Sequence, residues 1–200
     1  MANKIICIGR EFGSGGHEIA VRAGERLGIK VYEKNLVHLA CKYGNIAVKT
    51  LESADEKSTN PYFFQTVHEG NYHVMRGLPT SEVLYKIQSH EIQRIAKSES
   101  CIFVGRCADH VLKDADVQLL RVFVSAPTEN RIQRKMEQEN LSHLRAKSLV
   151  RKMELQRKEY YEHYTGNKWG DPKNYDLHIS TGIVSIEQAV ELIVQWFDEA

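Results

Sequence analysis

The chain has few of the residues that build disulfide frameworks or zinc sites, and it has no long apolar run. Its four cysteines, Cys7, Cys41, Cys101 and Cys107, form no CxxC pair, so the sequence predicts neither a metal site nor disulfide bonds. No stretch approaches the roughly 20 apolar residues of a membrane span, and the first residues do not form a signal peptide. We therefore expect a cytoplasmic protein without a membrane partner.

The chain also lacks an excess of charge of either sign. Its 27 Lys and Arg residues balance 26 Asp and Glu residues, which leaves a formal net charge of +1. Proteins that bind nucleic acid usually carry a basic surplus, so no nucleic-acid partner is predicted. With 200 residues, 42% of them hydrophobic and 26% charged, the composition is typical of a globular protein with a full core.

Short apolar segments alternate with long helical patterns along the chain. This alternation predicts an α/β fold, with a five-stranded parallel sheet flanked by helices. The predicted strands are Lys4–Ile8, Lys30–Tyr32, Cys101–Val104, Leu119–Val124 and Leu177–Ser180. The predicted helices are His17–Leu27, Lys34–Tyr43, Ser81–Ser98, Thr128–Glu139, His143–Tyr164 and Ile186–Phe197. We expect one domain over residues 1–200, in which 44–79 is an inserted arm and about 139–171 is a lid.

A glycine-rich loop follows the first predicted strand. The segment GREFGSGG runs from Gly9 to Gly16 and leads directly into the first helix. Glycines let backbone amides surround an anion closely, and the amino-terminal end of a helix adds partial positive charge. Strand, glycine loop and helix in this order are typical of a phosphate-binding turn, although a tight turn that binds nothing has the same pattern.

This loop departs from the standard phosphate loop, GxxxxGK[ST]. Gly16 stands at the lysine position, and His17 and Glu18 stand where small hydroxyl residues are usual. Arg10 is expected to replace the missing cation, with His17 as the second candidate, because arginine stays charged and binds phosphate with a planar fork. The predicted nucleotide-binding residues are Gly9, Arg10, Gly13, Ser14, Gly15, Gly16, His17 and Glu18.

A second candidate group follows the third predicted strand. Arg106 and Asp109 come directly after Cys101–Val104, and ligands of open parallel sheets bind beyond the carboxyl ends of the strands. Arg106 could clamp a phosphate with two hydrogen bonds, and Asp109 could orient that arginine or bind a metal. A structural Arg–Asp pair is the alternative. We therefore treat both residues as candidate substrate-binding residues.

Two predicted helices carry a third group. Arg131 and Arg134 lie one turn apart on the helix after the fourth strand, and Arg151 and Arg157 lie on the next helix. Arginines on helices over a phosphate site neutralise the charge that moves in phosphoryl transfer. These four and Arg10 are the candidate catalytic residues. For any one of the four, charge pairing on an exposed helix face is the alternative.

Most of the chain resembles the cytidylate kinase-like family of P-loop nucleoside monophosphate kinases. The resemblance is carried by GREFGSGGHEIA (9–20), IFVGRCADHVL (102–112), RVFVSAPTENRIQRK (121–135), RKMELQRKEYY (151–161) and YDLHISTG (175–182). It implies the P-loop kinase fold with a helical acceptor arm and lid. It also implies transfer of the γ-phosphate of ATP, with Mg²⁺, to CMP or dCMP, and an acceptor phosphate held by Arg106. A nucleotide-binding regulatory protein without turnover and a kinase of a non-nucleotide metabolite are the alternatives.

Overall fold

The structure is a computed structural model that describes most of the chain outside the second quarter. The described residues are 2–33, 35, 36, 38, 39, 55 and 80–199. The expected arm, 44–79, and much of the expected helix Lys34–Tyr43 lie outside them. The arm, and the assignment of residues 1–200 to one domain, therefore stay predictions.

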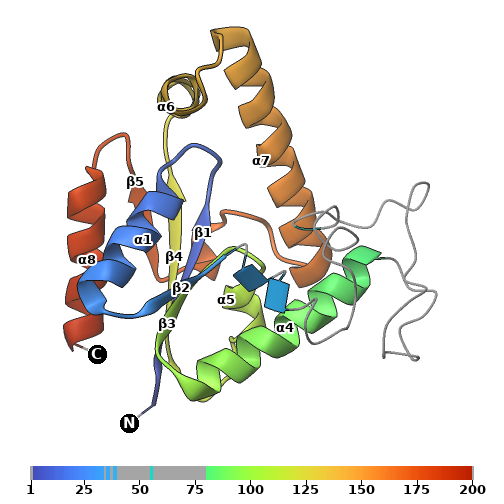
Figure 1. The fold of residues 1–200 in the computed structure, drawn as a ribbon, viewed down its shortest axis with the longest axis vertical. Helices are drawn as coiled ribbons and strands as arrows, with labels where there is room; N and C mark the ends of the chain where they lie inside the picture. The colour runs from blue at the N-terminus through green and yellow to red at the C-terminus, as the bar shows by residue number, and fades with distance from the viewer. Residues whose placement is uncertain (1, 34, 37, 40–54, 56–79, 200) are drawn as a thin grey trace.

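Five parallel strands form one sheet in the order β2-β3-β1-β4-β5 (Figure 1). The strands are β1 (Lys4–Arg10), β2 (Lys30–Tyr32), β3 (Cys101–Val104), β4 (Gln118–Ser125) and β5 (Leu177–Ser180). β1 is central, because Ile5 pairs with Cys101 on one side and with Leu119 on the other. The loops that follow β1 and β3 consequently lie beside each other at the carboxyl edge of the sheet. The predicted parallel sheet is confirmed.

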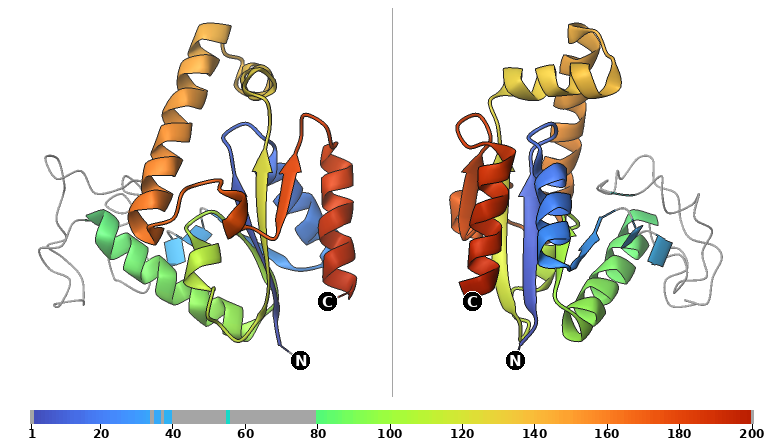
Figure 2. Two further views of the ribbon diagram at one scale, coloured as in Figure 1. Left: turned by 180° about the vertical axis from the view of Figure 1, so that it is seen from behind. Right: turned by 60° about the vertical axis from the view of Figure 1, so that its left-hand side comes forward.

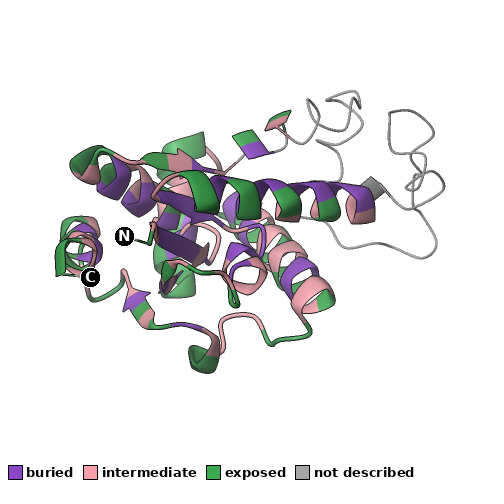
Figure 3. Ribbon diagram, turned by 90° about the horizontal axis from the view of Figure 1, so that it is seen from below, coloured by how far each residue is buried: buried purple, intermediate pink, exposed green. Residues whose placement is uncertain are grey.

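Helices cover both faces of this sheet (Figures 1 and 2). The described helices are α1 (Gly16–Leu27), α4 (Thr80–Ser98), α5 (Ala108–Val111), α6 (Thr128–Glu139), α7 (His143–Thr165), the 3-10 segment η2 (Pro172–Asn174) and α8 (Ile186–Glu199). Ile6 and Ile8 of β1 pack in one core with α1 and α8, while Ile5 and Cys7 pack in a second core with α4 and α5. Figure 3 shows the result for α4, which is buried along one side and exposed along the other.

Helices α6 and α7 extend beyond the carboxyl edge of the sheet (Figure 1). The expected lid region is mostly α7, and this helix is docked at both ends. Near its start, Ala146 and Val150 pack with Phe12 of the loop after β1. Near its end, the rings of Tyr164 and Tyr85 of α4 stack with centroids 4.0 Å apart. None of the helices in the described ranges is long and apolar enough to cross a membrane.

Candidate functional site

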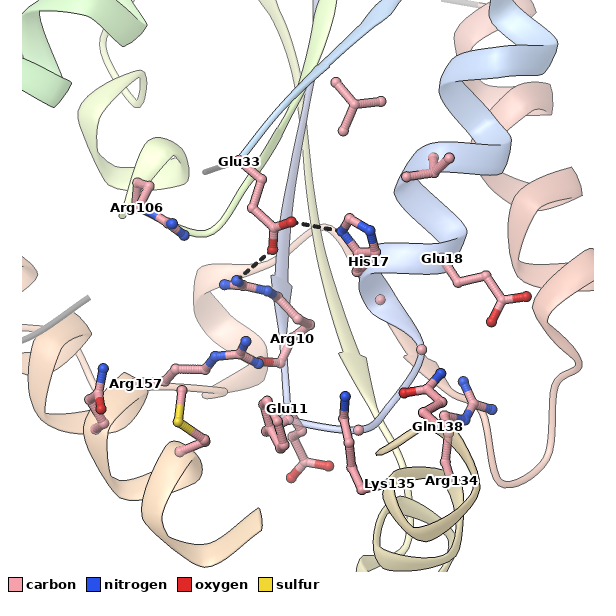
Figure 4. Close-up of a pocket in the computed structure, with 18 of the residues that line it drawn as sticks. Arg10, Glu11, His17, Glu18, Glu33, Arg106, Arg134, Lys135, Gln138 and Arg157 are labelled. Carbon is pink, nitrogen blue, oxygen red and sulfur yellow. Dashed lines mark hydrogen bonds and ion pairs between the residues drawn. The ribbon is translucent and has the colours of Figure 1, made fainter. Parts of the chain in front are cut away.

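A cavity of about 760 Å³ opens at the carboxyl edge of the sheet, between the loop after β1 and helices α6 and α7 (Figure 4). Cavities of this size accommodate small-molecule ligands. Its charged lining residues come from separate segments of the chain: Arg10, Glu11, His17, Glu18, Glu33, Asp55, Arg106, Arg134, Lys135 and Arg157. The glycine loop and Arg106, which the sequence placed in two candidate groups, therefore line one cavity.

The glycine loop has a backbone that only glycine adopts easily. Gly13 and Gly15 have φ angles of 85° and 90°, in the left-handed region that side chains disfavour. Ser14 between them is fully buried; its hydroxyl donates to the carbonyl of Glu11 at 2.9 Å, and its own carbonyl accepts from the hydroxyl of Thr181 at 2.7 Å. The first amides of α1, which follow directly, have no partner within the helix. The loop can therefore present these amides to an anion.

Arg131 does not line this cavity, contrary to the expectation of a catalytic arginine. It is only 6% exposed; its guanidinium pairs with Glu154 of α7 and donates to the carbonyl of Ala126 at 3.0 Å. The Nε atom also lies 3.4 Å from a carboxylate oxygen of Glu11 in the loop. Arg131 thus fastens the loop, α6 and α7 together. We call Arg131, Glu11 and Glu154 the loop clamp.

Arg151 is likewise outside the cavity, on the exposed face of α7, whereas Arg157 lines it. Six residues turn an α-helix through a net angle of about 240°, so the two side chains leave α7 in different directions. Arg131 and Arg134 lie one turn apart on α6, yet Arg131 pairs with Glu154 of α7. Arg134 does line the cavity.

Arg134 and its neighbour Lys135 reach the loop from α6. The Nη1 atom of Arg134 is buried without a hydrogen-bond partner among the described residues, and it occupies the place that a Cβ at Gly15 would need. The Lys135 amine lies 4.5 Å from the centre of the Phe12 ring and 3.1 Å from Glu139. Lys135 was missed at the sequence level, although it directly follows Arg134. Both cations are positioned to meet an anion at the loop.

On the other side of the cavity, Arg106 projects from a strained turn. Gly105, Arg106 and Cys107 all have positive φ angles, of 73°, 57° and 55°. Non-glycine residues in this region carry strain and are concentrated at functional sites. The Arg106 side chain is almost fully buried and donates to Asp55 at 2.5 Å. A buried guanidinium that pairs with a carboxylate in a strained turn can exchange that carboxylate for an anionic ligand.

Asp109 does not orient Arg106, so that expectation is wrong. It accepts a hydrogen bond of 2.7 Å from the Tyr161 hydroxyl of α7, and it belongs with Tyr161 and Tyr175 to a small cavity of about 20 Å³ behind the main one. The left-handed turn at Gly105–Cys107 precedes α5, so Asp109 and Arg106 meet different partners. Burial raises the pKa of Asp109, and the Tyr161 hydrogen bond opposes that rise. Asp109 thus holds the carboxyl-terminal end of α7 through Tyr161.

We predict that the free energy of unfolding falls less with rising pH in Asp109→Asn than in the wild type. The folded-state pKa of Asp109 lies above its ordinary value of 3.8. Its contribution to the free energy of unfolding is therefore fully present below that value and is lost as the pH rises through the raised pKa. Urea unfolding of both proteins at a series of pH values from 4 to 7.5 measures the difference. Parallel pH profiles would contradict the prediction.

The remaining loop candidates take different positions. His17 is largely exposed and its Nδ1 lies 2.7 Å from Glu33, whereas Glu18 points along α1 and pairs with Arg22 at 2.5 Å. Gly9 belongs to β1 rather than to the loop. A Cβ at Gly9 would come within 3.0 Å of the Phe123 ring. In the described part of the chain, no group of three His, Cys, Asp or Glu side chains could hold a metal ion.

Comparisons with known proteins agree with this architecture. Residues 5–183 match the cytidylate kinase-like family, and no curated protein matches the chain. An uncharacterized protein from Eubacterium ventriosum is 28% identical, with a TM-score of 0.73 over 99% of this chain and 100% of that one.

Two kinases of solved structure are more distant. APS kinase of Mycobacterium tuberculosis, in complex with AMPPNP and APS, has a TM-score of 0.54 and 17% identity over 98% of each chain. Shikimate kinase from Bacteroides thetaiotaomicron has a TM-score of 0.55 and 9% identity over 97% of this chain and 98% of that one. At these identities the likeness concerns the fold alone, which is the P-loop kinase fold.

Proposed function

The chain belongs to the cytidylate kinase-like family, and from this premise we propose that it is an ATP-dependent phosphotransferase acting on a nucleoside monophosphate, with CMP or dCMP as the leading acceptor. One observation carries the proposal: a single cavity joins a glycine loop, suited to phosphate, with a second set of arginines. Phosphoryl transfer needs this arrangement, because two anionic groups must be brought together and their charge neutralised.

The loop side of the cavity suits the phosphates of ATP. A Cβ at Gly13, Gly15 or Gly16 would collide with atoms of the protein, so glycine at these positions lets the loop pack closely against α6 and the Arg10 side chain. Arg134 and Lys135 would add positive charge from α6. Mg²⁺, bound with the nucleotide, would screen the negative charge of the phosphates. Bound Mg²⁺ usually keeps water and phosphate oxygens as ligands, so it would need at most one or two carboxylates of the lining.

The opposite side suits the phosphate of an acceptor. Arg106 is buried and preorganised there, and Arg157 donates to the carbonyl of Arg10 at 3.3 Å. Fixed arginines hold an acceptor phosphate in line with the donor and lower the repulsion between the two anions.

A nucleotide panel tests the proposal. Thermal unfolding is recorded with ATP, ADP and AMP, with and without Mg²⁺, since a ligand of the native state raises the midpoint. Transfer is then measured with CMP, dCMP, UMP and AMP as acceptors. We expect stabilisation by ATP and transfer to a cytidine nucleotide. Stabilisation by ATP without transfer to any acceptor would instead support a regulatory protein, which the glycine at the lysine position favours. Transfer only to a non-nucleotide acceptor would support a metabolite kinase.

Arg106→Ala should raise the KM for the acceptor by about 10- to 100-fold, as expected for loss of a charge-assisted phosphate contact. The affinity for ATP should change by less than about twofold, because the glycine loop is untouched. Arg106→Gly serves as a second variant, since it relieves the left-handed backbone while removing the same guanidinium. Arg106→Gly should raise the KM for the acceptor as much as Arg106→Ala does, and it should be at least as stable as Arg106→Ala. Equal losses for acceptor and ATP would show that Arg106 serves the fold.

A further inference from the structure

Two positions of the phosphate loop have exchanged their residue types. The standard pattern GxxxxGK[ST] places its lysine six residues after its first glycine. Here the lysine position holds Gly16, and the first-glycine position holds Arg10. A glycine has replaced the cation, and a cation has replaced the glycine.

The two positions touch each other across the loop. A Cβ at Gly16 would lie 3.2 Å from the Cγ of Arg10 and 2.6 Å from its Cβ, and the second distance is closer than such atoms approach in proteins. The left-handed glycines of the loop are Gly13 and Gly15, whereas Gly16 begins helix α1 with an ordinary backbone. The side chain of Arg10, and not the backbone conformation, therefore excludes a side chain at Gly16.

The Arg10 guanidinium lies between the two halves of the cavity. Arg10 is 5% exposed, and its Nη2 donates to Glu33 at 3.0 Å. Figure 4 shows it beneath Glu33, on the side where Arg106 and Arg157 also lie. The other carboxylate oxygen of Glu33 lies 2.7 Å from Nδ1 of His17. The Glu33 carboxylate thus holds the Arg10 guanidinium beside the loop, and a bound phosphate could replace Glu33 as its partner.

We propose that Arg10 is the phosphate-binding cation of this loop and replaces the lysine from the opposite side, with Glu33 as the positioning residue that holds it when no phosphate is bound. The inference rests on the proposed function, because it assigns a role at the same site. Its ligand is the β- and γ-phosphate pair of a nucleoside triphosphate. A guanidinium offers two parallel donors to such oxygens, where a lysine offers a single point charge.

Restoring the standard arrangement tests the exchange. Arg10→Gly and Gly16→Lys alone should each lower kcat/KM for ATP by about 10²-fold or more, as for removal of one charge-stabilising donor. The double variant Arg10→Gly/Gly16→Lys should recover at least about tenfold over either single variant. The matched control Arg10→Ala/Gly16→Lys retains the Cβ that collides at 2.6 Å and should not recover. A folded double variant no better than Arg10→Gly would overturn the proposal.

A binding measurement decides the matter if the double variant does not fold. Arg10→Gln keeps the Cβ and Cγ atoms but removes the charge, so calorimetric affinity for ADP and ATP should fall about 10- to 100-fold while affinity for AMP changes little. The exposed Lys147→Met on α7 is the charge-matched control and should leave all three affinities unchanged. Equal affinities of wild type and Arg10→Gln for ATP would overturn this inference alone. Failure of the wild type to bind ATP would overturn the proposed function with it.

Discussion

Gly13→Ala is expected to abolish nucleotide binding and to lower the free energy of unfolding by about 2–5 kcal/mol. Gly13 has a φ angle of 85°, and a Cβ there would lie 2.9 Å from the carbonyl oxygen of Arg131. Alanine is therefore strained twice, by a left-handed backbone and by a collision with backbone atoms of α6. Relief of that collision must displace the loop from α6, which moves the amides away from the cavity.

Gly28→Ala is the matched control for this substitution. Gly28 ends α1 with a φ angle of 65°, but a Cβ there would meet nothing within 4 Å. It should cost only about 1–2 kcal/mol, the price of the left-handed backbone, and leave ATP affinity unchanged. Urea unfolding and calorimetric titration with ATP measure both effects. Equal losses of unfolding free energy and of ATP affinity in Gly13→Ala and Gly28→Ala would show that the close approach of the loop to α6 contributes nothing to stability or binding.

Arg131→Met should lower the free energy of unfolding by about 3 kcal/mol, since removing one partner of a buried charge group leaves the others uncompensated. Without Arg131, the carboxylates of Glu11 and Glu154 lose the cation between them. Burial raises the pKa of Glu154, and the charge of Glu11 raises it further, while Arg131 holds it down. Because loss of Arg131 raises this pKa more, the deficit against wild type should grow as the pH rises above about 4.5.

Two further variants separate structure from catalysis. Arg131→Met/Glu154→Leu removes both buried partners and should recover part of the lost stability. Arg151→Met, on the exposed face of the same helix pair, should change stability by less than about 0.5 kcal/mol. Chemical unfolding across pH 4–8 measures all three variants beside wild type. Loss of transfer activity in Arg131→Met at full stability would restore the catalytic role that the sequence suggested.

The strands and long helices were predictable because their signals are local. An apolar run such as Ile5 to Ile8 indicates a strand covered on both faces, and the stripe of α8 indicates a docked helix. Helix α5 was not predicted, since it has only four residues and starts from a left-handed Cys107. Four residues are too few to show a helical period.

The direction of each charged side chain was harder to predict. The pattern ENRIQRK predicted a cationic helix, but not that Arg131 turns to Glu154 while Arg134 and Lys135 turn to the loop. Asp109 was assigned to Arg106 because the two are close in sequence, whereas its partner Tyr161 lies more than fifty residues away. The contact between Arg10 and the Gly16 position likewise joins two sides of a loop. Such partners depend on packing between elements, which spacing along the chain does not encode.

The central place of β1 delays formation of the sheet while the chain is being synthesised. Ile5 leaves the ribosome roughly a hundred residues before its partners Cys101 and Leu119. At translation speeds of about 5–20 residues per second, an apolar strand with two open edges waits about 5–20 seconds for its neighbours. During this period both edges of β1 are unpaired. Unless a chaperone covers it, β1 can associate with other nascent chains.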